Sequence, residues 1–317
     1  MIGWLQAGLR ALFMRVEALF NRAFGDRLNP LYHLGAIAFF LFWIVAATGL
    51  YLYAFFDTGV AEAYASVEGL SRGQWYAGGI LRSLHRYASD AMVTVMLVHM
   101  LRWFAFDRLH GFRAFSWLTG VGLVWLVYIA GINGYMLPWD RLSQLVTVAT
   151  FEWLDTLPGF GGTLIRNFIY PESVNDRLFS LLAFIHIGAP LIAGVIAWVH
   201  VQRVPRAHVN PPRPFAIAFT LMFVVLALVK PVVSDGAADF NTMPATMSFD
   251  WFYLMVYPFV TRGDGMTLWF VVGGLSVLLA VLPWLPPLRA SKGRPWRMKV
   301  HPGHATVPVR PHETLLD

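Results

Sequence analysis

Four histidines stand in two pairs with the same spacing. His85 and His99 are 14 residues apart, and so are His186 and His200. In an α-helix, 14 residues return to within roughly 40° of the same face and advance about 21 Å along the axis. Each pair would therefore place two imidazoles on one helix face at two depths. Two such helices side by side supply two stacked sites, each with two histidines.

Two histidines that face each other across a gap suit the axial positions of a flat iron macrocycle. Zinc would require three or four ligands close together. A lone histidine inside a membrane is often explained by a hydrogen bond to a neighbouring helix, but the repeated interval makes that explanation the weaker one. A proton relay is the other alternative, although the acidic side chains that would link such a relay are missing. The pattern thus favours two haems.

Glycine repeats the same interval. Gly35 and Gly49 are 14 residues apart, as are Gly120 and Gly134. A macrocycle needs close approach of the backbone, which only glycine allows because it lacks a Cβ. Glycines also mediate bare helix packing, but the match to the histidine interval favours clearance for haem.

Three arginines flank the histidines, and a guanidinium can pair with a haem propionate. They are Arg82, Arg86 and Arg102. We expect Arg82 and Arg102 to do so, and Arg86 to extend to the membrane interface. The chain of 317 residues has no cysteine, which excludes disulfides, iron–sulfur ligation and a thioether-attached haem within it.

The histidines must be positioned by membrane-spanning helices, because 57% of the residues are hydrophobic and only 13% are charged. Six stretches are long and apolar enough to span a bilayer. They are Leu34–Phe56, Gly79–Phe104, Phe115–Leu137, Leu178–Val201, Phe215–Val229 and Thr267–Leu285. The first 30 residues alternate apolar residues with arginines at helical spacing, which predicts an amphipathic helix on the membrane surface.

Lysine and arginine cluster in the N-terminal segment, the second-to-third and fourth-to-fifth connections, and the C-terminal tail. The other three connections lean acidic. By the positive-inside rule we expect both termini in the cytoplasm, and we expect the chain to lie in the cell inner membrane. The net charge of +6 therefore reflects membrane orientation and not nucleic-acid binding.

The chain resembles cytochrome b, the membrane core of cytochrome bc-type complexes, over about residues 25–290. The resemblance includes the four histidines, the four glycines, Arg82 and the run Gly134-Tyr-Met-Leu-Pro-Trp139. It implies an all-α membrane protein whose first four spans form a dihaem bundle. His85 and His186 would bind the low-potential haem near the acidic face, and His99 and His200 the high-potential haem near the cytoplasmic face.

The resulting division of the chain has four parts. Residues 1–30 form the interfacial helix, 31–205 the dihaem four-helix bundle, 206–290 two further transmembrane helices with a quinol-site-like loop, and 291–317 a cytoplasmic tail. By this resemblance we expect six spans, two fewer than in the eight-helix mitochondrial type.

The resemblance also implies quinone sites, and the chain departs from the family there. Where the family carries Pro-Glu-Trp-Tyr, this chain has Phe249-Asp250-Trp251-Phe252-Tyr253, and Val146 replaces a glycine of the pocket. Asp250 and Tyr135 are the implied catalytic residues. The implied quinone-binding residues are Tyr135, Pro138, Trp139, Val146, Asp250 and Trp251 on the acidic side, and Arg206 and His208 on the cytoplasmic side. For these last two, positive-inside charge is an equal alternative.

The predicted function is that of a dihaem cytochrome b subunit, a redox subunit of a quinone-dependent oxidoreductase complex that carries electrons between the quinone pool and a partner. The partners would be Rieske and cytochrome c subunits, or an iron–sulfur, flavin or molybdenum oxidoreductase that uses the chain as its membrane anchor. The resemblance also allows a homodimer. A haem-free proton transporter based on histidine is the alternative from another class.

Overall fold

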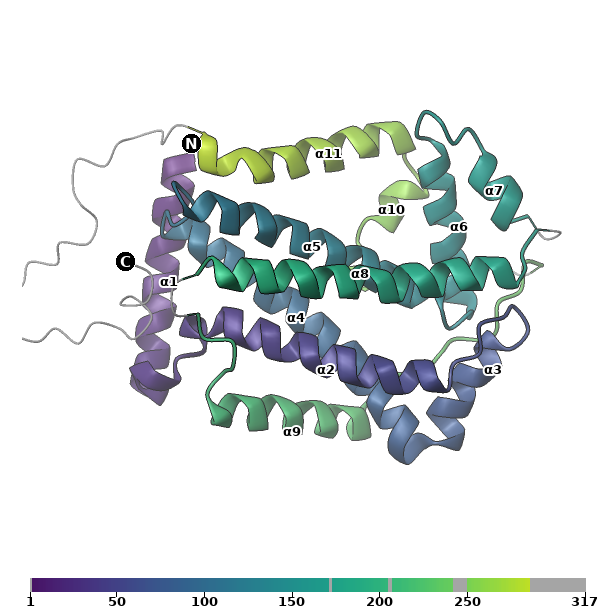
Figure 1. The fold of residues 1–317 in the computed structure, drawn as a ribbon, viewed down its shortest axis with the longest axis horizontal. Helices are drawn as coiled ribbons and strands as arrows, with labels where there is room; N and C mark the ends of the chain where they lie inside the picture. Colours follow the sequence, from purple (N-terminus) through teal and green to yellow (C-terminus); the bar gives the residue numbers. More distant parts are fainter. Residues whose placement is uncertain (1, 171–172, 205–206, 242–249, 286–317) are drawn as a thin grey trace, which may run out of the picture.

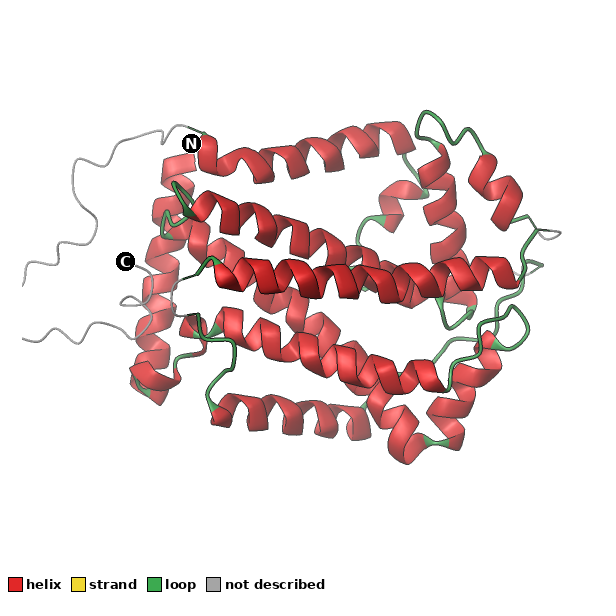
Figure 2. Ribbon diagram, in the orientation of Figure 1, coloured by secondary structure: helices red, strands yellow, loops and turns green. Residues whose placement is uncertain are grey.

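The computed structural model describes residues 2–170, 173–204, 207–241 and 250–285, and this part of the chain is helical without any strand (Figures 1 and 2). The long helices are α1 (Ile2–Phe24), α2 (Leu34–Ala54), α4 (Ile80–Ala105), α5 (Arg113–Met136), α8 (Asp176–Gln202), α9 (Arg213–Val229) and α11 (Gly265–Val281). The shorter ones are α3 (Ala63–Glu68), α6 (Arg141–Asp155), α7 (Thr163–Phe168) and α10 (Tyr257–Val260). Single turns of 3₁₀ helix cover Asp26–Leu28, Pro30–Tyr32 and Leu282–Trp284, and π-helical turns cover Gly69–Gly73 and Trp75–Gly79.

Six of these helices run roughly parallel and form the body of the molecule (Figure 1). Helix α2 packs along α4, and α5 packs along α8, so that the bundle consists of two tightly packed pairs. Helix α9 lies against α4 and α2, and α11 lies against α5. All six coincide with predicted spans, with ends that differ by a few residues. The predicted all-α membrane fold is thus confirmed.

The surface of the bundle is apolar, as expected for a protein surrounded by hydrocarbon. Helices α2, α5 and α8 are long and apolar enough to cross a membrane, and so is α11 when it is taken together with the 3₁₀ turn that continues it to Trp284. Helix α9 is apolar but has only 17 residues, whereas α4 carries charged side chains beside its histidines. Leu50, Phe184 and Phe270 are each about three-quarters exposed. A soluble protein would not expose so many large apolar side chains along whole helices.

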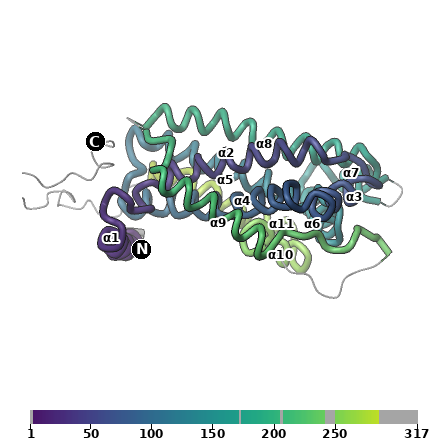
Figure 3. The backbone as a smooth tube through the Cα atoms, turned by 90° about the horizontal axis from the view of Figure 1, so that it is seen from below, coloured from purple at the N-terminus to yellow at the C-terminus, as the bar shows by residue number. Residues whose placement is uncertain are grey.

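Helix α1 crosses one end of the bundle, nearly perpendicular to the parallel helices, and is seen end-on in Figure 3. Phe13 packs on Phe106 with 6.3 Å between the ring centroids. The Glu17 side chain is buried against the bundle, where it pairs with Arg102. An apolar contact and a buried ion pair therefore fix α1 at this end, where the sequence predicts a helix on the membrane surface.

The opposite end is built from α3, α6, α7, α10 and the turn between α5 and α6. Trp139 in that turn adopts φ +49°, in the left-handed region. Asp140 follows it and caps α6, because its Oδ1 accepts hydrogen bonds from the backbone N–H and the hydroxyl of Ser143. Its Oδ2 accepts from the backbone N–H of Asp235. The one carboxylate thus ties the start of α6 to the segment that follows α9.

Candidate functional site

His85 on α4 and His186 on α8 face each other inside the bundle. Their ring centroids are 6.1 Å apart, and the ring planes are inclined by 58°. An iron atom bound by two imidazoles, with metal–nitrogen bonds of about 2 Å, would separate the ring centres by roughly 6 Å. The observed separation therefore fits one iron between the two rings.

The Nδ1 atom of each ring is held by a backbone carbonyl of the neighbouring helix. His85 Nδ1 lies 3.0 Å from the carbonyl oxygen of Val45, and His186 Nδ1 lies 2.9 Å from that of Ala130. A protonated Nδ1 donates to these carbonyls, which leaves the lone pair of Nε2 for a metal. Both rings are thus oriented as metal-binding histidines usually are.

Glycine makes these hydrogen bonds possible. Val45 and Ala130 each stand four residues before one of the predicted glycines, Gly49 and Gly134. A Cβ at either glycine would lie 2.9 Å from Cε1 of the opposing histidine, His85 or His186. Such a distance is too short, so a side chain there would push the imidazole away. The sequence predicts that these glycines make room for a macrocycle. In the structure, they leave the space that the imidazoles of His85 and His186 occupy.

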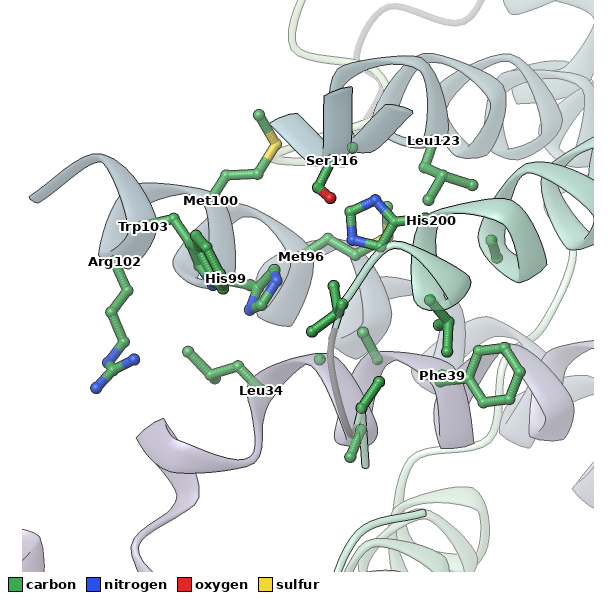
Figure 4. A pocket seen from close by; sticks show the side chains of 18 of the residues that line it. Leu34, Phe39, Met96, His99, Met100, Arg102, Trp103, Ser116, Leu123 and His200 are labelled. Atoms are coloured by element: carbon green, nitrogen blue, oxygen red, sulfur yellow. The ribbon is translucent and has the colours of Figure 1, made fainter. Parts of the chain in front are cut away.

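His99 and His200 form the second pair, and both line a cavity of about 280 Å³ at the α1 end of the bundle. Figure 4 shows them projecting toward this cavity from α4 and α8. His200 Nδ1 lies 2.8 Å from the hydroxyl of Thr119. Gly35 and Gly120 line the same cavity, but an added Cβ would lie 3.4 Å from His99 and 3.7 Å from His200, respectively. This site is therefore roomier than the first.

Polar side chains line the cavity toward the α1 end. Besides Tyr32, Arg102 and Trp103, they are His33, Arg108, Arg113, Ser116 and His208. Of these, the sequence predicts His208 alone as a site residue, while Arg206 lies outside the described residues. Burial lowers the pKa of His33, and the charge of His208 lowers it further. His33 is therefore neutral near pH 7.

Two predicted propionate-binding arginines have partners within the chain. Arg102 donates to Glu17 Oε1 at 2.9 Å, and in Figure 4 its side chain extends away from both imidazoles. Arg82 donates to the hydroxyls of Ser71 and Ser234 at 2.5 and 2.8 Å. Arg108 and Arg113, which lie in the connection between α4 and α5 and at the start of α5, are the arginines that line the cavity with Arg102. Their basic charge close to His99 could have indicated that they line this cavity. In the sequence analysis, that charge is explained by membrane orientation alone.

Arg86, which the sequence assigns to the membrane interface, is held by two carboxylates within the chain. Its Nε lies 3.0 Å from Asp90 Oδ2, and its Nη2 lies 2.5 Å from Asp250 Oδ2. The Asp250 side chain is only 4% exposed, which places a nearly buried carboxylate against α4. We call Asp90, Arg86 and Asp250 the charged triad.

The Tyr135 ring packs against the charged triad, because the guanidinium of Arg86 lies 4.2 Å from the centre of the Tyr135 ring. Its hydroxyl is buried, and no hydrogen-bond partner for it is present among the described residues. The structure therefore brings together the two predicted catalytic residues, Asp250 and Tyr135, around Arg86.

The other predicted acidic-side residues are spread around this point. Trp139 is buried, with its ring 5.1 Å from that of Phe179, and Pro138 before it is partly buried. Val146 is completely buried in the core. Trp251, by contrast, is 62% exposed. The structure thus places Trp139 and Val146 in the packed interior, and Trp251 at the surface.

Comparisons with known proteins agree with this arrangement. The family model described as cytochrome b/b6/petB matches residues 20–207, which include all four histidines. The cytochrome b6 of Chlamydomonas reinhardtii is 29% identical over 188 residues, covering 58% of this chain and 86% of that protein. The cytochrome b6 of Porphyra purpurea is 30% identical over the same coverage.

A solved structure titled "Hyperthermophilic respiratory Complex III" superimposes with a TM-score of 0.68 at 17% identity, covering 80% of this chain and 75% of that one. This likeness supports the fold. The family model supports more, because it spans more than half of the chain. The chain belongs to the cytochrome b family, multi-pass membrane proteins that take part in electron transfer with b-type haem.

Proposed function

We propose that the chain holds two b-type haems and carries electrons across the membrane between the quinone pool and a partner redox subunit. His85 and His186 would hold one haem near the acidic face, and His99 and His200 would hold the other near the cytoplasmic face. The observation that carries this proposal is the paired geometry, with facing imidazoles at 6.1 Å in one pair and a shared cavity in the other. Each bound haem would supply a one-electron iron centre.

The described side chains support two-histidine sites in particular. Among the described residues, no three His, Asp or Glu side chains come close enough to hold a metal ion by themselves. A metal at either pair would need its remaining ligands from another molecule, and a macrocycle provides four nitrogens in one plane. Gly49 and Gly134 keep the imidazoles of the first pair in place, and Gly35 and Gly120 leave room beside the second.

Arginines on both sides of the bundle are the proposed partners of the haem propionates. Arg82 remains the candidate near the acidic face. Near the cytoplasmic face, Arg108 and Arg113 line the cavity beside Arg102. Arg102 is engaged by Glu17, so we assign the first two as the main propionate partners there and Arg102 as the residue that fixes α1.

Quinone would react at both faces. On the acidic side, Asp250 and Tyr135 are the catalytic residues, and Asp250 accepts a proton from the quinol while Tyr135 offers a buried hydroxyl. Oxidation of a quinol releases two electrons and two protons, so this face needs a proton acceptor beside an electron acceptor. On the cytoplasmic side, His208 and Arg206 are the proposed quinone contacts, and His33 joins them because it lines the same cavity.

The partner is another redox subunit of a respiratory complex in the inner membrane, with both termini of this chain in the cytoplasm. The fold match to a protein titled respiratory Complex III supports a bc-type assembly with Rieske and cytochrome c subunits. The second candidate is a membrane anchor for a dehydrogenase or reductase without a Rieske subunit, because the acidic-side residues depart from the family pattern at Asp250 and Val146.

Haem extraction from the purified chain tests the proposal. We expect two non-covalent b-type haems per chain and reduction of both by a quinol. One haem per chain, or none, would contradict the assignment of ligands. Identification of the subunits that co-purify with the chain separates the two kinds of assembly, since a Rieske subunit supports the first and a cytoplasmic oxidoreductase supports the second.

A further inference from the structure

The charged triad joins two segments that are far apart in the sequence. Arg86 and Asp90 lie one turn apart on α4, and Asp250 comes 164 residues later, at the start of the segment that leads into α10. Charges held inside a membrane protein are costly unless they are paired, and they often mark functional sites. Neither Arg86 nor Asp90 belongs to the motifs that carry the family resemblance.

One carboxylate oxygen of Asp250 accepts hydrogen bonds from the backbone, and the other accepts one from Arg86. Its Oδ1 accepts from the backbone N–H groups of Phe252 and Tyr253, at 2.7 and 2.6 Å. Its Oδ2 accepts from Arg86 Nη2 at 2.5 Å. The carboxylate plane is therefore fixed, and the second lone pair of Oδ2 is the acceptor position that remains for another donor.

Arg86 is itself held from a second direction. Its Nε donates to Asp90 Oδ2 at 3.0 Å, and its guanidinium lies over the ring of Tyr135 at 4.2 Å. A guanidinium presents donors along more than one edge, so it can bind two carboxylates at once. Asp90 therefore orients Arg86, and Arg86 in turn orients Asp250.

The segment that contains Asp250 is anchored tightly around this point. Tyr253 is almost completely buried, and its hydroxyl lies 2.7 Å from that of Ser89 on α4. On α5, the Gly131 position leaves no space for a Cβ beside the Tyr253 ring. The Tyr257 hydroxyl lies 2.6 Å from that of Thr150 on α6. The Asp250 carboxylate is thus presented from a fixed backbone.

A ligand is indicated by the second polar group at this place. The hydroxyl of Tyr135 is buried without a hydrogen-bond partner among the described residues, although a buried hydroxyl normally finds one. It belongs to the ring that Arg86 covers, so Arg86 contacts both the unsatisfied tyrosine and the carboxylate. A small molecule with a hydroxyl group, such as a quinol, would satisfy groups of this kind.

We propose that Arg86 is a positioning residue of the acidic-side quinol site: it aims the Asp250 carboxylate to accept the hydrogen bond of a quinol hydroxyl, and Asp90 holds Arg86. This inference rests on the proposed function, which assigns Asp250 as the acceptor. It adds that Asp250, although one methylene shorter than the glutamate of the family motif, can serve as the acceptor in this chain because Arg86 on α4 fixes its position. Asp250 alone, without Arg86, would be a poorly placed acceptor.

The test uses the assembled complex isolated from its membrane, with decylubiquinol and menaquinol-4 as separate probes. The variants are Arg86→Gln, Arg86→Lys and Asp90→Asn. The matched control is Arg72→Gln, which removes an exposed arginine that pairs with Glu68. Haem content per chain is measured first, and then the maximal rate of quinol-driven haem reduction and the quinol concentration that gives half of it. Each variant is also made with His99→Ala, so that the acidic-side haem alone is reduced.

In Arg86→Gln we expect full haem content and a maximal rate lower by about tenfold, since a charge-assisted hydrogen bond that aims the acceptor is lost. Arg86→Lys should recover part of this rate because it keeps the charge, and Asp90→Asn should show a smaller loss. The control should behave as the parent does.

Parental rate and half-saturation in Arg86→Gln would overturn the inference. So would a loss of haem in both Arg86 variants with an unchanged rate per remaining haem, because the triad would then only hold the fold together. A parent that contains two haems but is not reduced by either quinol would instead overturn the quinone part of the proposed function, and this inference with it.

Discussion

The two ends of the helix bundle hold the same pair of ligands in different surroundings. At the α1 end, His99 and His200 border a cavity of about 280 Å³, and their glycines leave ordinary contact distances. At the other end, a Cβ at either glycine would lie only 2.9 Å from the imidazole of His85 or His186, and the charged triad includes Arg86, which directly follows His85. One 14-residue repeat therefore produces a roomy site and a tight one, depending on the residues between the repeats and on the segments that close each end.

This difference teaches that ligand spacing and site properties are set separately. The helical repeat determines where the imidazoles lie, and it is the same on both helices. The electrostatic surroundings come from residues outside the repeat, such as Glu17 at one end and Asp250 at the other. The predictions below compare variants at the two ends, or strongly and weakly held groups within one end.

The largest effect is expected from adding a side chain at the tight end. Gly134→Val places a branched side chain against His186, where even a Cβ would lie at 2.9 Å. We expect loss of the acidic-side haem, seen as half the haem content per chain in the reduced spectrum. Gly120→Val, at the roomy end, should retain more of its haem, because the corresponding Cβ lies 3.7 Å from His200.

Gly122→Val is the control on the same helix, since nothing lies within 4 Å of a Cβ there. It should keep both haems. Equal haem loss in Gly134→Val and Gly122→Val would show that valine disturbs α5 at any position. It would contradict the claim that the short distance to His186 causes the loss.

The next effect concerns the buried ion pairs that close the two ends. Asp250→Ala removes a carboxylate that is 4% exposed and leaves Arg86 with one partner. Breaking a buried pair from one side costs about 3–5 kcal/mol, so the thermal midpoint of unfolding should fall by several degrees. Glu17→Ala does the same to Arg102 at the α1 end, since the Glu17 side chain is 1% exposed. A thermal scan in detergent that shows no change for either variant would contradict the assignment of these pairs as stabilising.

A smaller effect is expected from the cap of α6 at the acidic end. Asp140→Ala removes the acceptor for Ser143 and Asp235, and loss of a helix cap costs about 0.5–2 kcal/mol. Asp264→Ala removes the cap of α11, which is the matched control. Among the described residues, the Asp264 side chain accepts hydrogen bonds only from Met266 and Thr267 of its own helix. Its variant should therefore unfold at a higher temperature than Asp140→Ala does; the reverse order would show that the tie to Asp235 adds nothing.

The smallest effect belongs to the exposed pair between Arg72 and Glu68, which are 2.6 Å apart. Arg72 is 77% exposed along its side chain, and an exposed ion pair contributes at most about 1 kcal/mol. Arg72→Ala should therefore unfold within a degree or two of the parent in the same thermal scan. A loss as large as that of Asp250→Ala would remove the distinction between buried and exposed pairs on which the comparison depends.

Much of the fold was predictable from the sequence because membrane helices are long apolar runs, and all six predicted spans are helices. The histidine and glycine intervals predicted two sites because they are local and periodic. The partners that connect distant segments were not predictable. Asp250 lies 164 residues from Arg86, and Glu17 lies 85 residues from Arg102. No periodicity joins such residues, so Arg86 was assigned to the interface and Arg102 to a propionate on charge and depth alone.

His33 illustrates a different limit. It precedes the first predicted span and belongs to no repeated interval, so nothing in the sequence marks it. The chain folds back so that His33 lines the same cavity as His208, which comes after α8. The approach of these two histidines is a property of the tertiary fold alone.

Two haems, each held by one histidine pair, are the central claim, and a potentiometric titration of the purified chain tests it most directly. The parent should titrate as two one-electron components of equal size in the visible α band. His99→Ala should lose one component and keep the other at nearly the same midpoint potential. A parent with a single component, or an His99→Ala variant that keeps both, would contradict the claim.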